Sequence, residues 1–154
     1  MKKCLIIMIL ALASVLGGCT HAGGDIGPLF GTWRLEELTA DGAKVELYGQ
    51  GDGAPELYVW AFQGELVSIR SIFEHQDVET FYGSWSRTDE ALTLNFTYSD
   101  DEDFDAFTPP AAMHLEADGI TTLKIINLTD KRLRLSYVNS QSGTTYEYNL
   151  KKAY

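Results

Sequence analysis

The chain has 154 residues, 22 of them acidic and 12 basic, and its formal net charge is -10 at pH 7. This charge excludes nucleic acid as an expected partner, because phosphate contacts need a basic surface. The length suits one domain with its own core.

The N-terminus has the features of a secretory signal. Lys2 and Lys3 precede an apolar run from Cys4 to Leu16, which is shorter than the roughly 20 residues of a membrane-spanning helix. The run ends in Leu-Gly-Gly-Cys, which resembles the lipobox of bacterial lipoproteins. The resemblance implies cleavage before Cys19 and a diacylglycerol on its thiol. An ordinary signal peptide with a cysteine near the cut is the alternative.

These features predict three parts: a signal peptide at 1–18, a lipidated cysteine with a glycine-rich tether at 19–28, and a folded domain at 29–154. Thr20 stands where lipoproteins of enteric type carry an aspartate if they stay at the inner membrane. The resemblance therefore implies a lipid-anchored protein of the cell envelope, at the outer membrane of a Gram-negative bacterium.

Processing would change the charge and the cysteine content of the mature protein. Loss of Lys2 and Lys3 would move the formal charge from -10 to -12. Cys4 would leave with the signal and Cys19 would be acylated, so we expect no disulfide, and the core alone must supply stability.

The rest of the chain alternates apolar and polar residues with period two, which predicts β-strands. The pattern shifts phase at Ile126 and Leu128, which indicates a β-bulge. The expected strands are 32–38, 44–48, 57–63, 66–73, 78–87, 91–98, 113–116, 121–128, 132–137 and 144–152. We therefore expect an all-β fold, a single antiparallel up-and-down β-barrel of about eight to ten strands.

The strand at 57–62 is apolar on both faces. Either a neighbouring segment covers its outer face, or its inner face lines a cavity. The inward aromatic residues of this and later strands are the candidate ligand-cavity residues: Tyr58, Trp60, Phe62, Phe96, Tyr98, Tyr146 and Tyr148.

A cluster of carboxylates follows the strand at 91–98. We expect a solvated acidic loop and no metal site, because the spacing fits no EF-hand; if Ca²⁺ did bind, Asp100, Asp101 and Asp103 are the candidate ligands. Apolar residues near the end of this loop predict that it lies across a barrel mouth as a lid: Phe104, Phe107, Pro109 and Pro110.

No motif predicts catalysis. The three histidines have no metal spacing, and no serine lies in a nucleophile elbow, so we expect no enzyme activity and no cofactor.

The segment Ser142-Gly143-Thr-Thr-Tyr146 is similar to the loop with which membrane-bound inhibitors of C-type lysozyme enter the enzyme. The resemblance implies a basic protein as a possible partner. However, this protein lacks the cysteine pair that is usual in that family, and its chain is longer than theirs. Ser-Gly before an aromatic strand is also common in ordinary β-hairpins.

Gly31-Thr-Trp33 at the first strand resembles the opening of the lipocalin and wider calycin families. There the tryptophan closes one end of the barrel and packs against a basic side chain from a late strand, for which Arg132 or Arg134 would be the candidates. Further matches resemble lipocalin-like bacterial lipoproteins of an uncharacterised family: Gly83-Ser84-Trp85, 123–129, 133–135 and 146–150.

The resemblance implies a fold and a location more than a function. Our leading hypothesis is an envelope protein that binds a small hydrophobic or amphipathic molecule inside its barrel. A barrel of this size holds either one small ligand or only its own side chains. A filled barrel, acting as a structural or protein-interaction module, is therefore the alternative.

Overall fold

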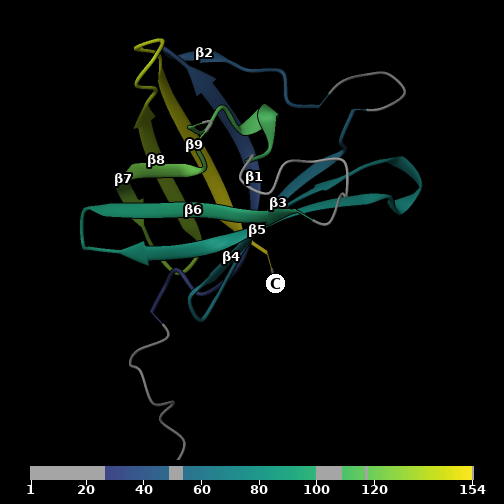
Figure 1. Cartoon of the computed structure of the whole chain (residues 1–154), viewed down its shortest axis with the longest axis horizontal. Helices are drawn as coiled ribbons and strands as arrows, with labels where there is room; N and C mark the ends of the chain where they lie inside the picture. Colours follow the sequence, from purple (N-terminus) through teal and green to yellow (C-terminus); the bar gives the residue numbers. More distant parts are fainter. Residues whose placement is uncertain (1–26, 49–53, 100–108, 117, 154) are drawn as a thin grey trace, which may run out of the picture.

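The computed structural model describes residues 27–48, 54–99, 109–116 and 118–153, which form an antiparallel β-barrel (Figure 1). Its elements in chain order are β1 (Gly31–Ala40), β2 (Ala43–Lys44), β3 (Leu57–Gln63), β4 (Leu66–Ile72), η1 (Glu74–Gln76), β5 (Val78–Arg87), β6 (Ala91–Ser99), η2 (Ala111–Met113), β7 (Ile120–Leu128), β8 (Arg132–Val138) and β9 (Thr145–Lys152).

Strands that follow one another in the chain pair with one another, except that the short β2 pairs only with the end of β1 and β1 pairs next with β3. The barrel closes because β1 also pairs with β9, from Trp33 opposite Lys152 to Ala40 opposite Tyr146. The predicted up-and-down barrel is therefore confirmed. The described core residues all lie between Leu29 and Leu150, so this buried cluster includes no residue before Leu29.

The core consists of the inward-facing residues of the strands, which alternate with outward-facing residues along each strand. In β6, Leu92, Leu94 and Phe96 are each at most 1% exposed. Leu133, Leu135 and Tyr137 of β8 are buried in the same cluster. A register shift between Ile125 and Asn127 of β7 confirms the predicted bulge.

Both Gly-x-Trp segments need their glycine for a backbone reason. Gly31 has a φ of +116°, which disfavours any other residue. A Cβ on Gly83 would lie 2.2 Å from the carbonyl oxygen of Asn95, beside the point where the register of β5 and β6 shifts. The repeated motif therefore marks two tight strand contacts.

The outer face of β3 is covered by its neighbours. The register places Val59 between Arg34 of β1 and Arg70 of β4, and Val59 is 6% exposed. The Nε atom of Arg70 is itself buried, so the stem of this arginine lies along the sheet. Covering by adjacent strands accounts for the two apolar faces.

Two predicted strands were wrong. Of 44–48, only the first residue lies in a strand; the chain then crosses the barrel end, where Leu47 is buried and the Tyr48 hydroxyl donates to the carbonyl of Leu35 at 2.6 Å. The segment 113–116 leaves η2 at His114, which has a φ of 51°. Met113 and Leu115 do alternate inward, but they cover the end of the barrel and join no sheet.

Trp33 closes the opposite end, as the lipocalin resemblance implied. Its side chain is fully buried, and its Nε1 donates to the carbonyl of Leu29 at 2.7 Å. The cation over its ring is Lys152 of β9, with Nζ 4.5 Å from the centroid. Lys152 also donates to the carbonyls of Pro28 and Phe30.

Arg132 and Arg134 are wrong as partners of Trp33. Both lie on the outer face of β8, where Arg132 pairs with Glu36 and Arg134 with Glu147. The physical reason is the strand register, which places Lys152, and neither arginine, opposite Trp33.

Candidate functional site

The candidate site is the mouth of the barrel, which is the end opposite Trp33. Strand β1 begins at the closed end, near Trp33, and ends at the mouth. At this end the cross-strand register aligns Tyr58 of β3, Ser71 of β4 and Glu79 of β5 in one row. Residues in such a row share a face of the sheet, and Tyr58 belongs to the buried core. The row therefore presents a phenol, a hydroxyl and a carboxylate toward the inside of the mouth.

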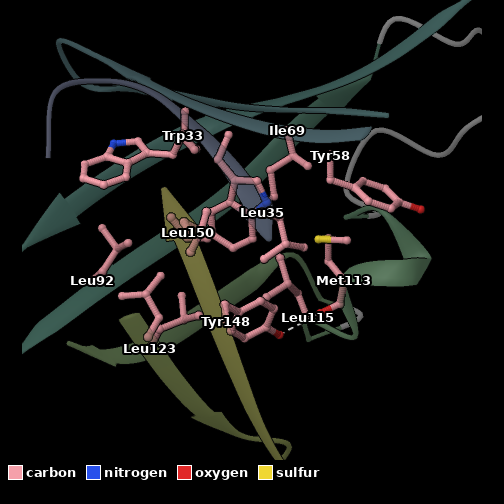
Figure 2. Close-up of a cluster of buried hydrophobic side chains, with 14 of the residues drawn as sticks. Trp33, Leu35, Tyr58, Ile69, Leu92, Met113, Leu115, Leu123, Tyr148 and Leu150 are labelled. Carbon is pink, nitrogen blue, oxygen red and sulfur yellow. Dashed lines mark hydrogen bonds between the residues drawn. The ribbon is translucent and has the colours of Figure 1, made fainter. Parts of the chain in front are cut away.

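Residues 109–116, here called the mouth segment, cover this end. Pro109 and Pro110 are buried, and Met113 is fully buried within the core cluster. Figure 2 shows Met113 and Leu115 directed into the cluster beside Tyr148, whose hydroxyl donates to the carbonyl of Met113 at 2.7 Å. Pro109 and Pro110 of the expected lid thus lie at the mouth, whereas Phe104 and Phe107 lie outside the described residues.

The C-terminal end of the mouth segment is held by hydrogen bonds around Glu116. Its backbone N–H donates to Oγ1 of Thr121, and its carboxylate accepts from the N–H of Ser140, both at 3.0 Å. Hydrogen bonds to the Tyr137 hydroxyl, the Ser140 backbone and the Ser140 side chain lower the pKa of the Glu116 carboxyl. Burial raises the pKa of Tyr137, so its hydroxyl remains a donor.

A hollow of about 280 Å³ lies between the polar row and the mouth segment. Its wall on the barrel side includes Tyr58, Ser71, Glu79 and Phe81, and its other wall is the mouth segment from Pro110 to Ala112. Burial raises the pKa of Tyr58, and Tyr48 and Glu79 raise it further, so the phenol stays protonated. The hollow can therefore offer an apolar surface, two hydroxyl groups and one carboxylate.

Most of the predicted cavity residues do point into the barrel. Trp60 and Tyr148 lie with ring centroids 5.6 Å apart, and Phe62 meets Trp85 edge to face at 5.5 Å. Tyr58, Trp60, Phe62, Phe96 and Tyr148 are all at most 3% exposed. They belong to one buried cluster together with aliphatic side chains.

Two predicted cavity residues differ from this group. Tyr146 is half-buried and stacks on His114 of the mouth segment, with ring centroids 4.8 Å apart. The side chain of Tyr98 lies outside the described residues, as do Cys19 and the acidic residues Asp100, Asp101 and Asp103.

Sequence reasoning missed Ser71, Glu79 and Met113. In β4 the inward positions Val67 and Ile69 are followed two residues later by Ser71, so period two could have shown a polar residue on the inner face. To predict that Glu79 lies beside Ser71, one must know how β4 pairs with β5, and the sequence alone does not give this pairing.

The residues that resemble an inhibitor loop lie on the β8–β9 hairpin. The side-chain oxygen of Asn139 accepts from the N–H of Gln141, the N–H of Ser142 and the Ser142 hydroxyl. Gly143 has a φ of 72°, as the turn requires. Ser142 and Tyr146 thus both have partners within the chain.

Within the part of the chain that the structure describes, no three histidine, cysteine or acidic residues gather as a metal site would require. The same part contains no helix with the length and apolar character to cross a membrane.

Comparison with known proteins agrees with this architecture. A lipocalin-like protein from Bacteroides uniformis has 20% identity and a TM-score of 0.58, over 82% of this chain and 100% of that one. An uncharacterised protein from Bacteroides eggerthii has 19% identity and a TM-score of 0.56, over 81% of this chain and 99% of that one.

Curated protein sequences gave no significant match. The family model described as "Lipocalin-like domain" matches residues 13–147. This match spans most of the 154 residues. The chain therefore belongs to the family of lipocalin-like domains.

Proposed function

We propose that this protein binds a small hydrophobic or amphipathic molecule at the mouth of its barrel, as a binding protein and not an enzyme. The observation that carries the proposal is the hollow between the inner wall of β3–β5 and the mouth segment. Pockets for small molecules are concave and mostly apolar with a few placed polar groups. This hollow has that composition, with Phe81 and prolines beside the hydroxyls of Tyr58 and Ser71.

Deeper binding would involve Met113. The hollow of about 280 Å³ is at the lower limit for a small-ligand pocket, which is about 300 Å³. Met113 is unbranched and flexible, and it occupies the space directly inside the mouth. A longer apolar chain would bind by displacing this side chain, with Tyr148 and Trp60 below it.

The proposal includes a lipid on Cys19 and a location at the outer membrane. Support comes from the lipobox-like sequence and from the position of the chain's first described residues. Pro28 and Phe30 lie at the closed end, bonded to Lys152. A membrane anchor joined there would leave the mouth facing away from the lipid surface.

Displacement of a fluorescent probe tests this function. The protein from residue 20 to 154 is titrated with N-phenyl-1-naphthylamine, and the stoichiometry is checked by native mass spectrometry. Ala111→Trp fills the hollow from an exposed position on its rim and should abolish probe binding. Ser86→Trp, exposed near the closed end, is the matched control and should bind like the wild type. Absence of probe binding by the wild type would refute the proposal.

A second candidate, a protein-interaction module, is favoured by the number of large side chains buried in the barrel. Among the described residues, Trp33, Trp60, Phe62, Phe96 and Tyr148 are fully buried. The acidic surface would suit a basic partner such as lysozyme.

A further inference from the structure

The mouth hollow contains a carboxylate on the inner face of a barrel wall. Glu79 occupies the same row as Tyr58 and Ser71. It is half-buried, and among the described residues that line the hollow it is the one with a formal charge. Because this carboxylate is half-buried, its charge is screened less by water than that of an exposed carboxylate and acts more strongly on a ligand in the hollow.

The rim around this hollow has the same sign of charge. The described residues in the connections at the mouth include one lysine, Lys44, and seven carboxylates: Asp41, Glu46, Glu56, Glu74, Asp77, Glu116 and Asp118. Like charges add their fields in a cleft with low-dielectric walls, so the rim strengthens the potential that Glu79 creates. A ligand whose polar end is an anion would be repelled both on approach and when bound.

We infer that the mouth selects amphiphiles whose polar end is a cation, such as an alkylammonium group, and discriminates against fatty-acid anions. This inference rests on the proposed function, whose site it uses. The ammonium lies beside the Glu79 carboxylate and donates to it, while the apolar chain passes Phe81 and the mouth segment toward Met113. Tyr58 and Ser71 supply neutral hydrogen-bonding groups to the same polar end.

Three ligands that share a dodecyl chain test the inference: dodecylammonium, dodecanol and dodecanoate. Each competes with N-phenyl-1-naphthylamine on the protein from residue 20 to 154, below its micellar concentration. We expect dodecylammonium to bind about tenfold or more tightly than dodecanoate, with dodecanol between them. Added salt should reduce this ratio only partly, because a half-buried charge is screened less than an exposed one.

Glu79→Gln removes the charge and keeps the shape of the side chain. It should reduce the preference for dodecylammonium over dodecanoate by about tenfold and leave the affinity for dodecanol within about twofold. Asp77→Asn removes an exposed carboxylate from the same rim and is the control. It should change the preference by less than about twofold.

The possible results separate the inference from the function beneath it. If the wild type binds the probe and dodecanol but takes dodecanoate as tightly as dodecylammonium, the selectivity is refuted and ligand binding stands. If Glu79→Gln and Asp77→Asn act equally, the selectivity comes from overall charge, and the role of Glu79 is refuted. If the wild type binds neither the probe nor any of the three ligands, both fail together.

Discussion

Met113 offers the sharpest test of how the barrel mouth works. Its side chain is fully buried, so Met113→Ala removes packing from the core. Buried Met→Ala changes cost about 2–5 kcal/mol, and a position at the rim, where neighbours can settle, belongs to the low end. We expect a loss of about 2 kcal/mol in the free energy of unfolding, equivalent to about 6–10 °C in Tm for a domain of this size.

The same change should improve binding. If a ligand must displace the Met113 side chain, binding costs up to the packing energy of that side chain, about 2 kcal/mol. Met113→Ala removes this cost, and about 2 kcal/mol corresponds to about thirtyfold in affinity. Urea denaturation followed by circular dichroism measures the stability, and titration with N-phenyl-1-naphthylamine measures the affinity. Stability and affinity should therefore move in opposite directions.

Leu92→Ala is the matched control. Leu92 is fully buried, and Figure 2 shows it on the opposite side of the core cluster from Met113. It should lose comparable stability and gain no affinity, because one missing side chain leaves a space far smaller than the probe. If Met113→Ala binds the probe no better than the wild type, Met113 does not obstruct the mouth.

Three other predictions follow from single contacts. Lys152→Ala should destabilise the fold by about 1 kcal/mol, measured by urea denaturation, because it removes the cation from Trp33 and two bonds to backbone carbonyls. Burial raises the pKa of Tyr148, so the folded state holds this proton more tightly than the unfolded chain. The stability from this group is complete below a pH of about 10 and falls at higher pH; Tyr148→Phe should flatten this alkaline loss in a denaturation series. For the lysozyme hypothesis, any inhibition of C-type lysozyme should disappear in a Ser142→Ala, Tyr146→Ala double variant.

Each of these predictions has a contradicting result. Lys151→Ala, which alters an exposed neighbour on β9, should change the stability by less than about 0.5 kcal/mol, and an equal loss in both variants would deny Lys152 a special role. An unchanged alkaline profile in Tyr148→Phe would assign the loss to other groups, with Tyr137 the next candidate. Inhibition that persists in the double variant would exclude the hairpin mechanism.

The strands could be predicted because they are amphipathic. The alternation at 91–98 and 132–137 depends only on one face being buried, and the bulge near Ile126 broke that alternation visibly. The segment with Met113 and Leu115 shows the limit of the method. Two inward residues separated by one outward residue give the same pattern in a strand and in a coil that covers a barrel end.

The site could be predicted only in part, because it depends on register. The inward aromatic residues followed from period two alone. The alignment of Glu79 with Ser71 and Tyr58 requires two strand pairings, and the choice of Lys152 over Arg132 requires the pairing of the first strand with the last. Such contacts join residues far apart in the chain, which no local pattern encodes.

The closure of the barrel by β1 and β9 also governs how the chain can fold. A chain made from its N-terminus cannot complete this pairing until its last strand, Thr145–Lys152, has been synthesised. Until then β1 and β8 each present an open edge, and the contacts of β1 with β9 that close the barrel are among the least local in the molecule. Folding should therefore be slow and should finish only with the whole chain. Loss of β9 would convert the closed barrel into an open sheet with two edges that can aggregate.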